Sequence, residues 1–254
     1  MIVPRPTTLT PLSGEFRFTD ETTLSAPEAV ADLAREVLGR PLPPGGAAGG
    51  ITMRLVDEAA LGPEGYRLRV TADGVEVLAL TENGLRWAVQ TLRQLLPVEG
   101  EPVVPAVEIR DVPRYAWRGS LLDVARWCHP LPFLYRYVDL LALHKLNTLH
   151  LHLTDDQGWR FEVRKYPLLT EVGGFRREST AGHAREQRLD GVPHGGFYTQ
   201  TELRDLVAYA ARRGVRIMPE VDMPGHTQAA IAAYPHLGND PARRLEGRTS
   251  WGIS

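Results

Sequence analysis

The sequence has a single cysteine, Cys128, among its 254 residues. One cysteine cannot form an intrachain disulfide, and a zinc site built on several cysteines is excluded. A small buried side chain is therefore the expected role of Cys128.

Long apolar runs and a strong excess of charge are also missing. No apolar stretch approaches the ~18 residues that a membrane-spanning helix needs, and the N-terminal residues lack the apolar core of a signal peptide. We therefore expect a cytoplasmic protein that binds no membrane, with secretion as the open alternative. The formal net charge is −2, without a basic block, which argues against nucleic acid as a partner.

The remaining composition is that of a folded globular protein. Hydrophobic residues make up 43% and charged residues 24%, and both fractions are typical of globular domains. The length suits one large domain or two ordinary ones. Two regions of different pattern predict two domains, residues 1–112 and 113–254, with the boundary in a proline-rich segment at 102–113.

The first region alternates short strands with two helices. A helix is expected over 27–38, closed by Gly39, and a second over 83–96 with apolar residues at helical spacing. The strands are expected at 14–23, 51–56, 65–70 and 75–79, the last two joined by an Asp-Gly turn. This pattern predicts an α+β domain that carries no catalytic group of its own.

The second region repeats a strand followed by a helix. Strands are expected over 118–125, 148–153 and 215–221. The intervening helices are expected around Leu134–Leu141, after a capping box that begins at Thr199, and over 227–234. Such repeats predict a parallel sheet of the α/β class, here a (β/α)8 TIM barrel.

The barrel prediction conflicts with the length of the region. A whole barrel needs eight units and roughly 250 residues, whereas residues 113–254 hold about three units and end in an expected loop at Trp251–Ser254. We therefore expect the chain to be a truncated portion of a larger protein.

The most informative run is residues 148–160. Leu149, Leu151 and Leu153 alternate with polar residues, as in a strand that is buried on one face. The polar face and the residues that follow it contain His150, His152, Asp155, Asp156 and Trp159. Polar groups beside an apolar stripe are costly unless they have partners, so the run predicts the mouth of a polar pocket. An aromatic ring beside carboxylates and histidines suits a sugar.

Functional groups of barrels follow the C-terminal ends of the strands. The three strand ends carry Arg126, then Asp155 and Asp156, then Asp222 with His226. Guanidinium, carboxylate and imidazole groups can bind ring hydroxyls and tune a proton donor. A structural ion pair for Arg126 and satisfied core histidines are the alternatives. Strand parity alone places Asp156, not Asp155, on the face of His152.

Together these residues resemble a known family. The motifs are Tyr115-Ala-Trp-Arg-Gly-Ser-Leu-Leu-Asp-Val-Ala-Arg126, Lys145-Leu-Asn147, His150-Leu-His-Leu-Thr-Asp-Asp-Gln-Gly-Trp159, Gly196-Phe-Tyr-Thr-Gln200 and Pro219-Glu-Val-Asp-Met-Pro-Gly-His226. In this order they resemble the first third of the catalytic barrel of β-N-acetylhexosaminidases, family 20 of the glycoside hydrolases. Residues 64–68 and 91–96 resemble the α+β domain that precedes this barrel.

The resemblance implies a hydrolase that removes terminal β-linked N-acetylglucosamine or N-acetylgalactosamine. Catalysis in the family is substrate-assisted and retaining, and the resemblance implies no cofactor and no metal. Arg126 matches the arginine that holds hydroxyls of the terminal sugar, and Trp159 is expected to contact the same sugar. Asp155 and His226 match residues near the catalytic acid, and Asp222 matches the carboxylate beside that histidine.

The sequence departs from the family in its principal catalytic pair. In the family an adjacent Asp-Glu pair orients the acetamido group and protonates the leaving oxygen, in a Gly-Gly-Asp-Glu context. Here the Asp-Glu dipeptides are Asp20-Glu21 and Asp57-Glu58, both in the first region. We therefore expect residues 1–254 alone to be inactive.

Two other functions compete with this interpretation. His150 and His152 on one strand, with Asp155, Asp222 and His226, could form the site of a metal-dependent, amidohydrolase-like barrel. A non-catalytic carbohydrate-binding fragment is the second alternative.

Overall fold

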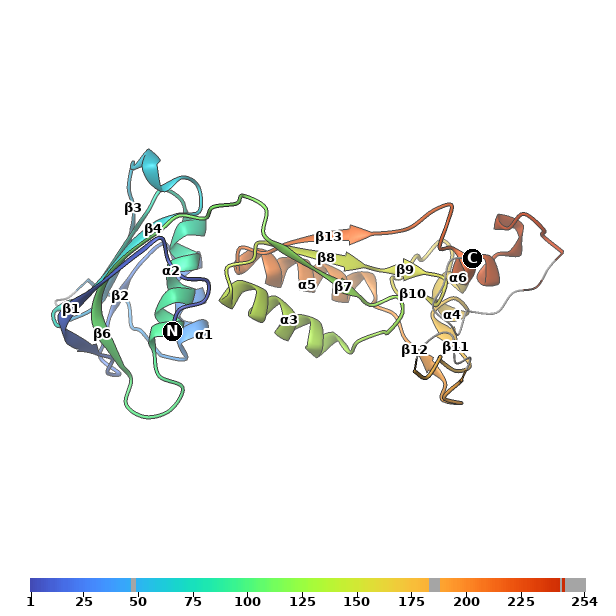
Figure 1. Cartoon of the computed structure of the whole chain (residues 1–254), viewed down its shortest axis with the longest axis horizontal. Coiled ribbons are helices and arrows are strands. Elements are labelled where there is room, and N and C mark those ends of the chain that lie inside the picture. The colour runs from blue at the N-terminus through green and yellow to red at the C-terminus, as the bar shows by residue number, and fades with distance from the viewer. Residues whose placement is uncertain (47–48, 183–187, 243, 245–254) are drawn as a thin grey trace. The chain divides into compact units, whose positions relative to one another are not determined.

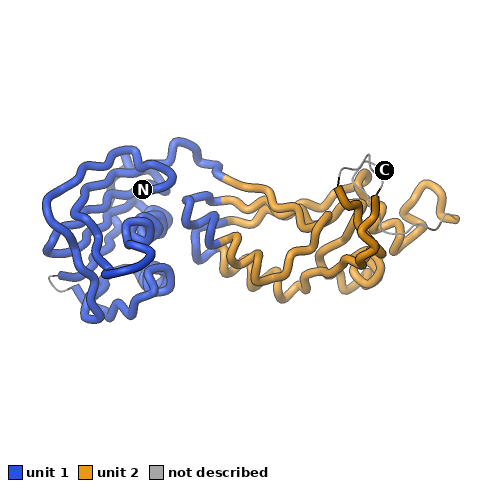
Figure 2. The backbone as a smooth tube through the Cα atoms, turned by 60° about the horizontal axis from the view of Figure 1, so that its bottom comes forward, with its two compact units in different colours: residues 1–118, 139–147, 211–215 blue, residues 119–138, 148–210, 216–254 orange. Residues whose placement is uncertain are grey.

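The computed structural model describes residues 1–46, 49–182, 188–242 and 244, so the loop expected at 251–254 lies outside the described residues. The chain forms two compact units, which Figure 2 colours separately. One comprises residues 1–118, 139–147 and 211–215, and the other comprises residues 119–138, 148–210 and 216–254. Over the described residues, no helix has the length and apolarity required to cross a membrane.

The first unit is built on a six-stranded mixed sheet in the order β1-β6-β4-β5-β3-β2. Its strands are β1 (Thr8–Arg17), β2 (Leu24–Ser25), β3 (Ile51–Leu55), β4 (Tyr66–Thr71), β5 (Gly74–Ala79) and β6 (Val103–Asp111). The helices are α1 (Glu28–Leu38) and α2 (Glu82–Leu95), with a 3₁₀ turn, η1, at Ala59–Leu61. Both α-helices lie on one face of the sheet (Figure 1).

The apolar spacing of the sequence explains how the helices of this unit pack. In α2 four apolar residues at helical spacing are all fully buried: Leu85, Ala88, Val89 and Leu92. Gly39 ends α1 in the left-handed conformation, as predicted, and its amide donates to the carbonyl of Arg35. The turn at Asp73-Gly74 joins β4 and β5 as an antiparallel hairpin.

One strand of this unit was not predicted, and another was misplaced. The proline-rich segment 102–113 contains β6, which pairs with both β1 and β4. Pro105 is tolerated there because the pairing with β4 begins only at Val107, so the missing N–H leaves that ladder intact. The first strand is Thr8–Arg17 rather than 14–23, with an irregularity of the register between Pro11 and Glu15.

A buried polar network crosses the core of the first unit. The ammonium group of Lys145 donates to Asp111 Oδ2 at 2.7 Å and to the Tyr66 hydroxyl at 2.8 Å. The same hydroxyl lies 2.6 Å from Thr91 Oγ1. Burial lowers the pKa of Lys145, and Asp111 opposes this effect. Each polar group of the network therefore has a partner, as buried polar groups require.

The second unit contains a parallel sheet in the order β13-β8-β7, as predicted for successive βα units. Its strands are β7 (Gly119–Asp123), β8 (Thr148–His152) and β13 (Arg216–Glu220), with the short strands β9 (Thr154–Asp155), β10 (Gly158–Trp159), β11 (Phe175–Arg176) and β12 (His194–Gly195). The helices that alternate with these strands are α3 (Leu131–Leu143), α4 (Leu168–Glu171), α5 (Gln200–Arg212) and α6 (Gln228–Ala233), with a 3₁₀ turn, η3, at Pro235–Leu237. Residues 139–143 of α3 and 211–212 of α5 belong to the first unit. Helices α3 and α5 run along one face of the parallel sheet (Figure 1).

Local sequence signals account for these elements. Leu149, Leu151 and Leu153 are buried as predicted, but Thr148 and His152 on the other face are buried as well, so β8 is covered on both faces. The capping box of α5 is formed, because Thr199 Oγ1 accepts from the Glu202 amide at 3.2 Å and Glu202 accepts from the Thr199 amide at 2.7 Å. In α5, Leu206 and Ala210 are fully buried, whereas Val207 is 50% exposed.

Candidate functional site

Polar side chains from three neighbouring strands meet at the C-terminal edge of the parallel sheet. β8 lies between β7 and β13, and all three run in the same direction. The register pairs His152 with Asp123 on one side and with Glu220 on the other. Since carboxyl ends of parallel strands share one edge, residues far apart in sequence come together here.

Asp155 is the centre of this cluster. Its side chain is almost fully buried, and its Oδ2 lies 2.5 Å from Arg126 NH2 and 2.9 Å from His152 Nε2. Its Oδ1 accepts the Asp156 amide at 2.7 Å and lies 3.1 Å from His226 Nδ1. Burial opposes ionisation, but the hydrogen bonds from His152 and the Asp156 amide, with the charges of Arg126 and His226, lower the pKa of Asp155. Asp155 therefore remains a carboxylate.

The preference for Asp155 over Asp156 agrees with this geometry, whereas strand parity does not. β8 ends at His152, and Thr154–Asp155 begins a separate hairpin with β10. The alternation of faces is interrupted at this break, so Asp155 turns back toward His152. Asp156 is fully buried, and its Oδ1 accepts the amide of Gln228 at 3.1 Å at the start of α6.

Arg126 is held by acceptors on three sides. Its Nε donates to Gln157 at 2.9 Å, its NH1 to Asp123 Oδ2 at 2.8 Å, and its NH2 faces Asp155. Asp123 Oδ1 also accepts the Arg126 amide at 3.0 Å, which fixes the turn after β7. A guanidinium fixed in this way presents a defined edge to a polar ligand. The structural ion pair considered for Arg126 is present, and it lies within the site.

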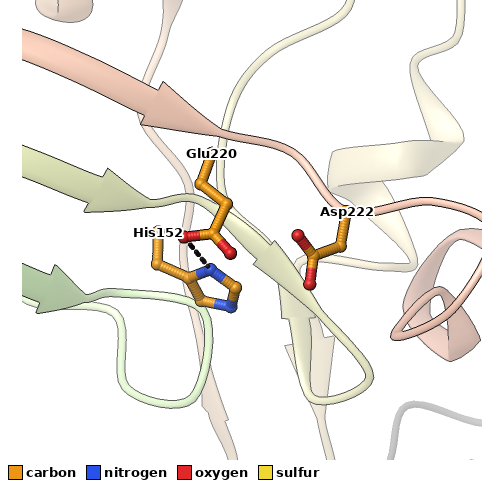
Figure 3. Close-up of side chains that lie close together, drawn as sticks. All are labelled: His152, Glu220 and Asp222. Atoms are coloured by element: carbon orange, nitrogen blue, oxygen red, sulfur yellow. Dashed lines mark ion pairs between the residues drawn. The ribbon is translucent and has the colours of Figure 1, made fainter.

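His152 and Glu220 extend the cluster toward β13. His152 Nδ1 lies 3.0 Å from Glu220 Oε2, and His150 Nε2 lies 2.5 Å from the same oxygen. Figure 3 shows the imidazole of His152 facing Glu220, with Asp222 beside them. The hydrogen bond to Asp155 raises the pKa of His152 to about 9, and Glu220 adds to this increase against the cost of burial.

Asp222 and Glu220 have different electrostatic environments. Burial and the neighbouring Glu220 charge raise the pKa of Asp222. Burial would also raise the pKa of Glu220, but His152 and His150 outweigh it and lower that pKa. Two carboxyl groups whose pKa values are shifted in opposite directions can take different roles, one as a proton carrier and the other as a fixed charge. The Asp222 backbone is fixed by its amide, which donates to Thr154 Oγ1 at 3.1 Å.

His226 reaches the cluster from the loop between β13 and α6. Its backbone has φ 55°, in the left-handed region, which costs an L-residue about 1 kcal/mol. This conformation accompanies the contact between its Nδ1 and Asp155 Oδ1. The structure thus brings together four of the five predicted site residues: Arg126, Asp155, Asp222 and His226.

Trp159 lies apart from these four. Its ring is 8% exposed and packs in a hydrophobic cluster with Leu169 and three alanines of α6. The indole N–H donates to the Phe161 carbonyl at 2.8 Å. Its side chain therefore contributes to packing beneath the hairpin, and a contact with a sugar stays a prediction.

Two arginines with buried side chains support the loops of the site. Arg160 is fully buried and donates to backbone carbonyls of Val124, Ala125, Gly174 and Gly196 at 2.6–3.1 Å. Arg176 donates to the Arg126 carbonyl at 2.8 Å. Burial lowers the pKa of Arg176 to about 10, and the Arg160 charge adds to this shift. These contacts join the loop after β7 to later segments of the chain.

Two groups of residues among those described have the spacing of metal ligands: His152 with Glu220 and Asp222, and Asp155 with Asp156 and His226. The donor atoms are already paired with one another. His152 has a carboxylate oxygen at each ring nitrogen, and His226 Nδ1 faces Asp155. An imidazole nitrogen that donates to a carboxylate has no lone pair for a metal, so the geometry does not favour the amidohydrolase-like alternative.

The sequence argument missed two members of the cluster. Glu220 has the same strand parity as Asp222 and ends β13, so its position at the strand end could have identified it. Asp123 ends β7 three residues before Arg126. His152, expected only to line the pocket, instead contacts Asp155 and Glu220 directly.

Family comparisons cover both units. Residues 115–254 match the model for the glycosyl hydrolase family 20 catalytic domain, and residues 1–112 match domain 2 of the same family. A β-hexosaminidase of Porphyromonas gingivalis is 38% identical over 99% of this chain and 34% of its own length. A β-N-acetylhexosaminidase of Cellulomonas fimi is 41% identical over 93% of this chain and 48% of its own length.

Solved structures agree with these matches. A mutant Streptomyces plicatus β-hexosaminidase in complex with its product, GlcNAc, is 37% identical and superposes with a TM-score of 0.86. The match covers 99% of this chain and 51% of that one. The predicted fold class, an α+β domain followed by part of a TIM barrel, is confirmed. The chain spans between a third and about half of the length of these relatives.

Proposed function

The chain belongs to glycosyl hydrolase family 20, and we propose that it supplies the first part of the active site of a β-N-acetylhexosaminidase. The observation that carries this proposal is the joint placement of Arg126, Asp155 and His226 at one edge of the parallel sheet. The domain division follows the same proposal, with residues 1–112 as the N-terminal domain and 113–254 as the catalytic portion.

The proposed substrates are glycans that end in β-linked N-acetylglucosamine or N-acetylgalactosamine. The Streptomyces plicatus relative was solved with GlcNAc bound, which supports this class of sugar. Arg126 would bind hydroxyls of the terminal residue, since its guanidinium is fixed by Gln157, Asp123 and Asp155. A preorganised donor of this kind aligns the sugar without reorganisation during the reaction.

Asp155 and His226 would act on the proton donor of the reaction. Asp155 is held ionised by Arg126 and His152 and directs one oxygen at His226 Nδ1. The orientation of His226 then leaves its other ring nitrogen to face a general acid of the family type. Asp222, with its raised pKa, would be the carboxylate beside that pair.

We further propose that residues 1–254 alone do not hydrolyse hexosaminides, because the family's adjacent Asp-Glu pair has no counterpart in the second region. The test is incubation of the purified chain with a nitrophenyl N-acetylglucosaminide. Release of nitrophenol above the rate of the D155N variant would contradict this proposal.

A chimera tests the site itself. Residues 1–254 replace the matching segment of the Cellulomonas fimi relative, so that the remainder of that enzyme follows. We expect turnover by the chimera, with a loss of about 10²-fold or more in D155N and R126M, as for groups that align reacting atoms. A cooperatively folded chimera without turnover, or with turnover that is unaffected by both variants, would overturn the proposal.

A further inference from the structure

His152 lies between two carboxylates that come from different segments of the chain. Its Nε2 is 2.9 Å from Asp155 Oδ2, and its Nδ1 is 3.0 Å from Glu220 Oε2. The side chain is 6% exposed, too little for it to be a main sugar contact. Among the described residues, it is the only histidine with an ion-pair contact at both ring nitrogens.

This geometry determines the protonation of the ring. A neutral imidazole has one N–H, so one of the two contacts would set a nitrogen lone pair against a carboxylate oxygen. Both contacts are attractive only when the ring carries two protons. His152 is therefore an imidazolium, with a charged hydrogen bond to Asp155 on one side and an ion-pair contact with Glu220 on the other.

The other charged groups around the ring favour this assignment on balance, although the Arg126 guanidinium opposes it. Arg126 NH1 lies 3.2 Å from His152 Nε2, but its hydrogen bond to Asp123 is shorter, at 2.8 Å. Asp123 ends β7 and Arg126 follows it, and Asp155 lies in β9. Glu220 ends β13, and Asp222 follows it. The carboxylates outnumber the guanidinium, which favours a positive charge at the centre of the group.

The imidazolium fixes the orientation of Asp155. Oδ2 of this carboxylate is occupied by His152 and Arg126, so Oδ1 faces the Asp156 amide and His226. Rotation of the carboxylate would break two charged contacts at once. The tautomer of His226 is set by the acceptor that its Nδ1 meets.

We propose that His152, kept protonated by Glu220, is a positioning residue that holds Asp155 with Oδ1 directed at His226. The catalytic importance of Asp155 rests on the proposed function. The arrangement of its side chain does not, because it requires no bound sugar. The proposal adds Glu220 and His152 to the residues named by the family resemblance. Four side chains are then connected in the order Glu220, His152, Asp155 and His226.

The first test observes the ring protons of His152 in the 254-residue chain labelled with ¹⁵N-histidine. Long-range ¹H–¹⁵N spectra from pH 5 to 10 distinguish imidazolium from each neutral tautomer, and H152Q assigns the signal. We expect both ring nitrogens of His152 to remain protonated through about pH 8, consistent with its pKa of about 9. A midpoint near the ordinary 6.5 would overturn the proposal.

Glu220 provides a variant that retains His152. In E220Q we expect the His152 midpoint to fall by about one unit or more, because a charged acceptor becomes neutral. H150Q is the matched control, since His150 contacts the same oxygen of Glu220 but not Asp155, and it should leave His152 protonated through pH 8. An unchanged midpoint in E220Q would overturn the role assigned to Glu220.

The tautomer of His226 shows whether His152 positions Asp155 or has only a structural role. In the wild type the neutral ring of His226 should carry its proton on Nδ1, which donates to Asp155 Oδ1. In H152Q, with unchanged circular dichroism, we expect the Nε2–H form, which predominates in free imidazole side chains. Retention of the Nδ1–H form in H152Q, or in E220Q if H152Q does not fold, would contradict the proposal. These spectra do not depend on hydrolysis, so failure of the proposed function would leave them unchanged.

Discussion

The ammonium nitrogen of Lys145 lies 2.7 Å from Oδ2 of Asp111, and both side chains are largely buried in the first unit. Lys145 has φ 57°, and the amides of residues 145 and 146 donate to the carbonyls of Ala142 and Leu141. This is the hydrogen-bond pattern that ends a helix in a left-handed residue. A lysine therefore occupies a backbone position that usually favours glycine, with its side chain anchored in the polar network.

Replacement of Lys145 by methionine should destabilise the chain by about 3–5 kcal/mol, because the charge of Asp111 would remain buried without its cation. The K145M/D111L double variant should recover part of this loss, as it removes both charges. Urea unfolding of the two variants measures the difference. Equal stability of K145M and the wild type would refute the prediction.

Alanine at position 158 should lower the free energy of unfolding by roughly 2–4 kcal/mol, the range for overpacking a core together with displacing a hydrogen-bonded group. A Cβ there would lie 2.2 Å from the guanidinium of Arg160, which donates to several backbone carbonyls. Thermal unfolding of G158A provides the measurement. G225A is the control, since a Cβ at Gly225 would meet no atom within 4 Å, and equal effects of the two variants would contradict the clash.

Stability should decrease as the pH rises through about 9. The pKa of His152 is about 9 in the folded chain against an ordinary value of 6.5, so the folded state binds this proton more tightly. The stabilisation is complete below pH 6.5 and is lost above pH 9. We expect a decrease of roughly 1–3 kcal/mol over this interval after allowance for coupling to neighbouring charges. Urea unfolding at pH 6, 8 and 10 should show a flatter dependence for H152Q, and parallel curves for both proteins would refute the assignment.

Lysine at position 126 should weaken binding of N-acetylglucosamine about tenfold or more, since one ammonium group cannot replace a guanidinium that is oriented from three sides. Titration of the chimera with this sugar, followed by intrinsic fluorescence, gives the affinity. R164K is the control, because Arg164 is 65% exposed and has a long contact of 3.6 Å to Glu162. Comparable affinities for R126K and the wild type would show that Arg126 does not bind the sugar.

Periodicity predicted most of the regular elements because burial repeats with the geometry of the helix or strand. The apolar stripes of α1, α2 and α3 and the alternation in β8 all correspond to buried residues. β6 was missed because Pro105 suggested a boundary, and β1 was misplaced around Pro11 and Gly14. Local turn signals cannot reveal that β4 pairs with β6 only from Val107 onward, beyond Pro105.

The candidate site was predictable where a residue lies in the loop just after a strand, as with Arg126 and Asp222. It was not predictable where the backbone changes direction. Because of the break between β8 and β9, the side chain of Asp155 points toward His152, against the alternation expected of a continuous strand. Only the family resemblance favoured this residue over Asp156. Trp159 looked suited to a sugar, but the hairpin of β9 and β10 directs its ring into the apolar cluster.

The guanidinium of Arg160 has a consequence for how the second unit opens. Its N–H groups donate to carbonyls in the loop after β7, at Gly174 and at Gly196. If one of these loops moved away, the buried guanidinium would lose hydrogen-bond acceptors. The amides of these loops should therefore exchange with solvent in a single cooperative event rather than loop by loop. The segments that hold Arg126 in place would then melt together, and the site would be either assembled or absent.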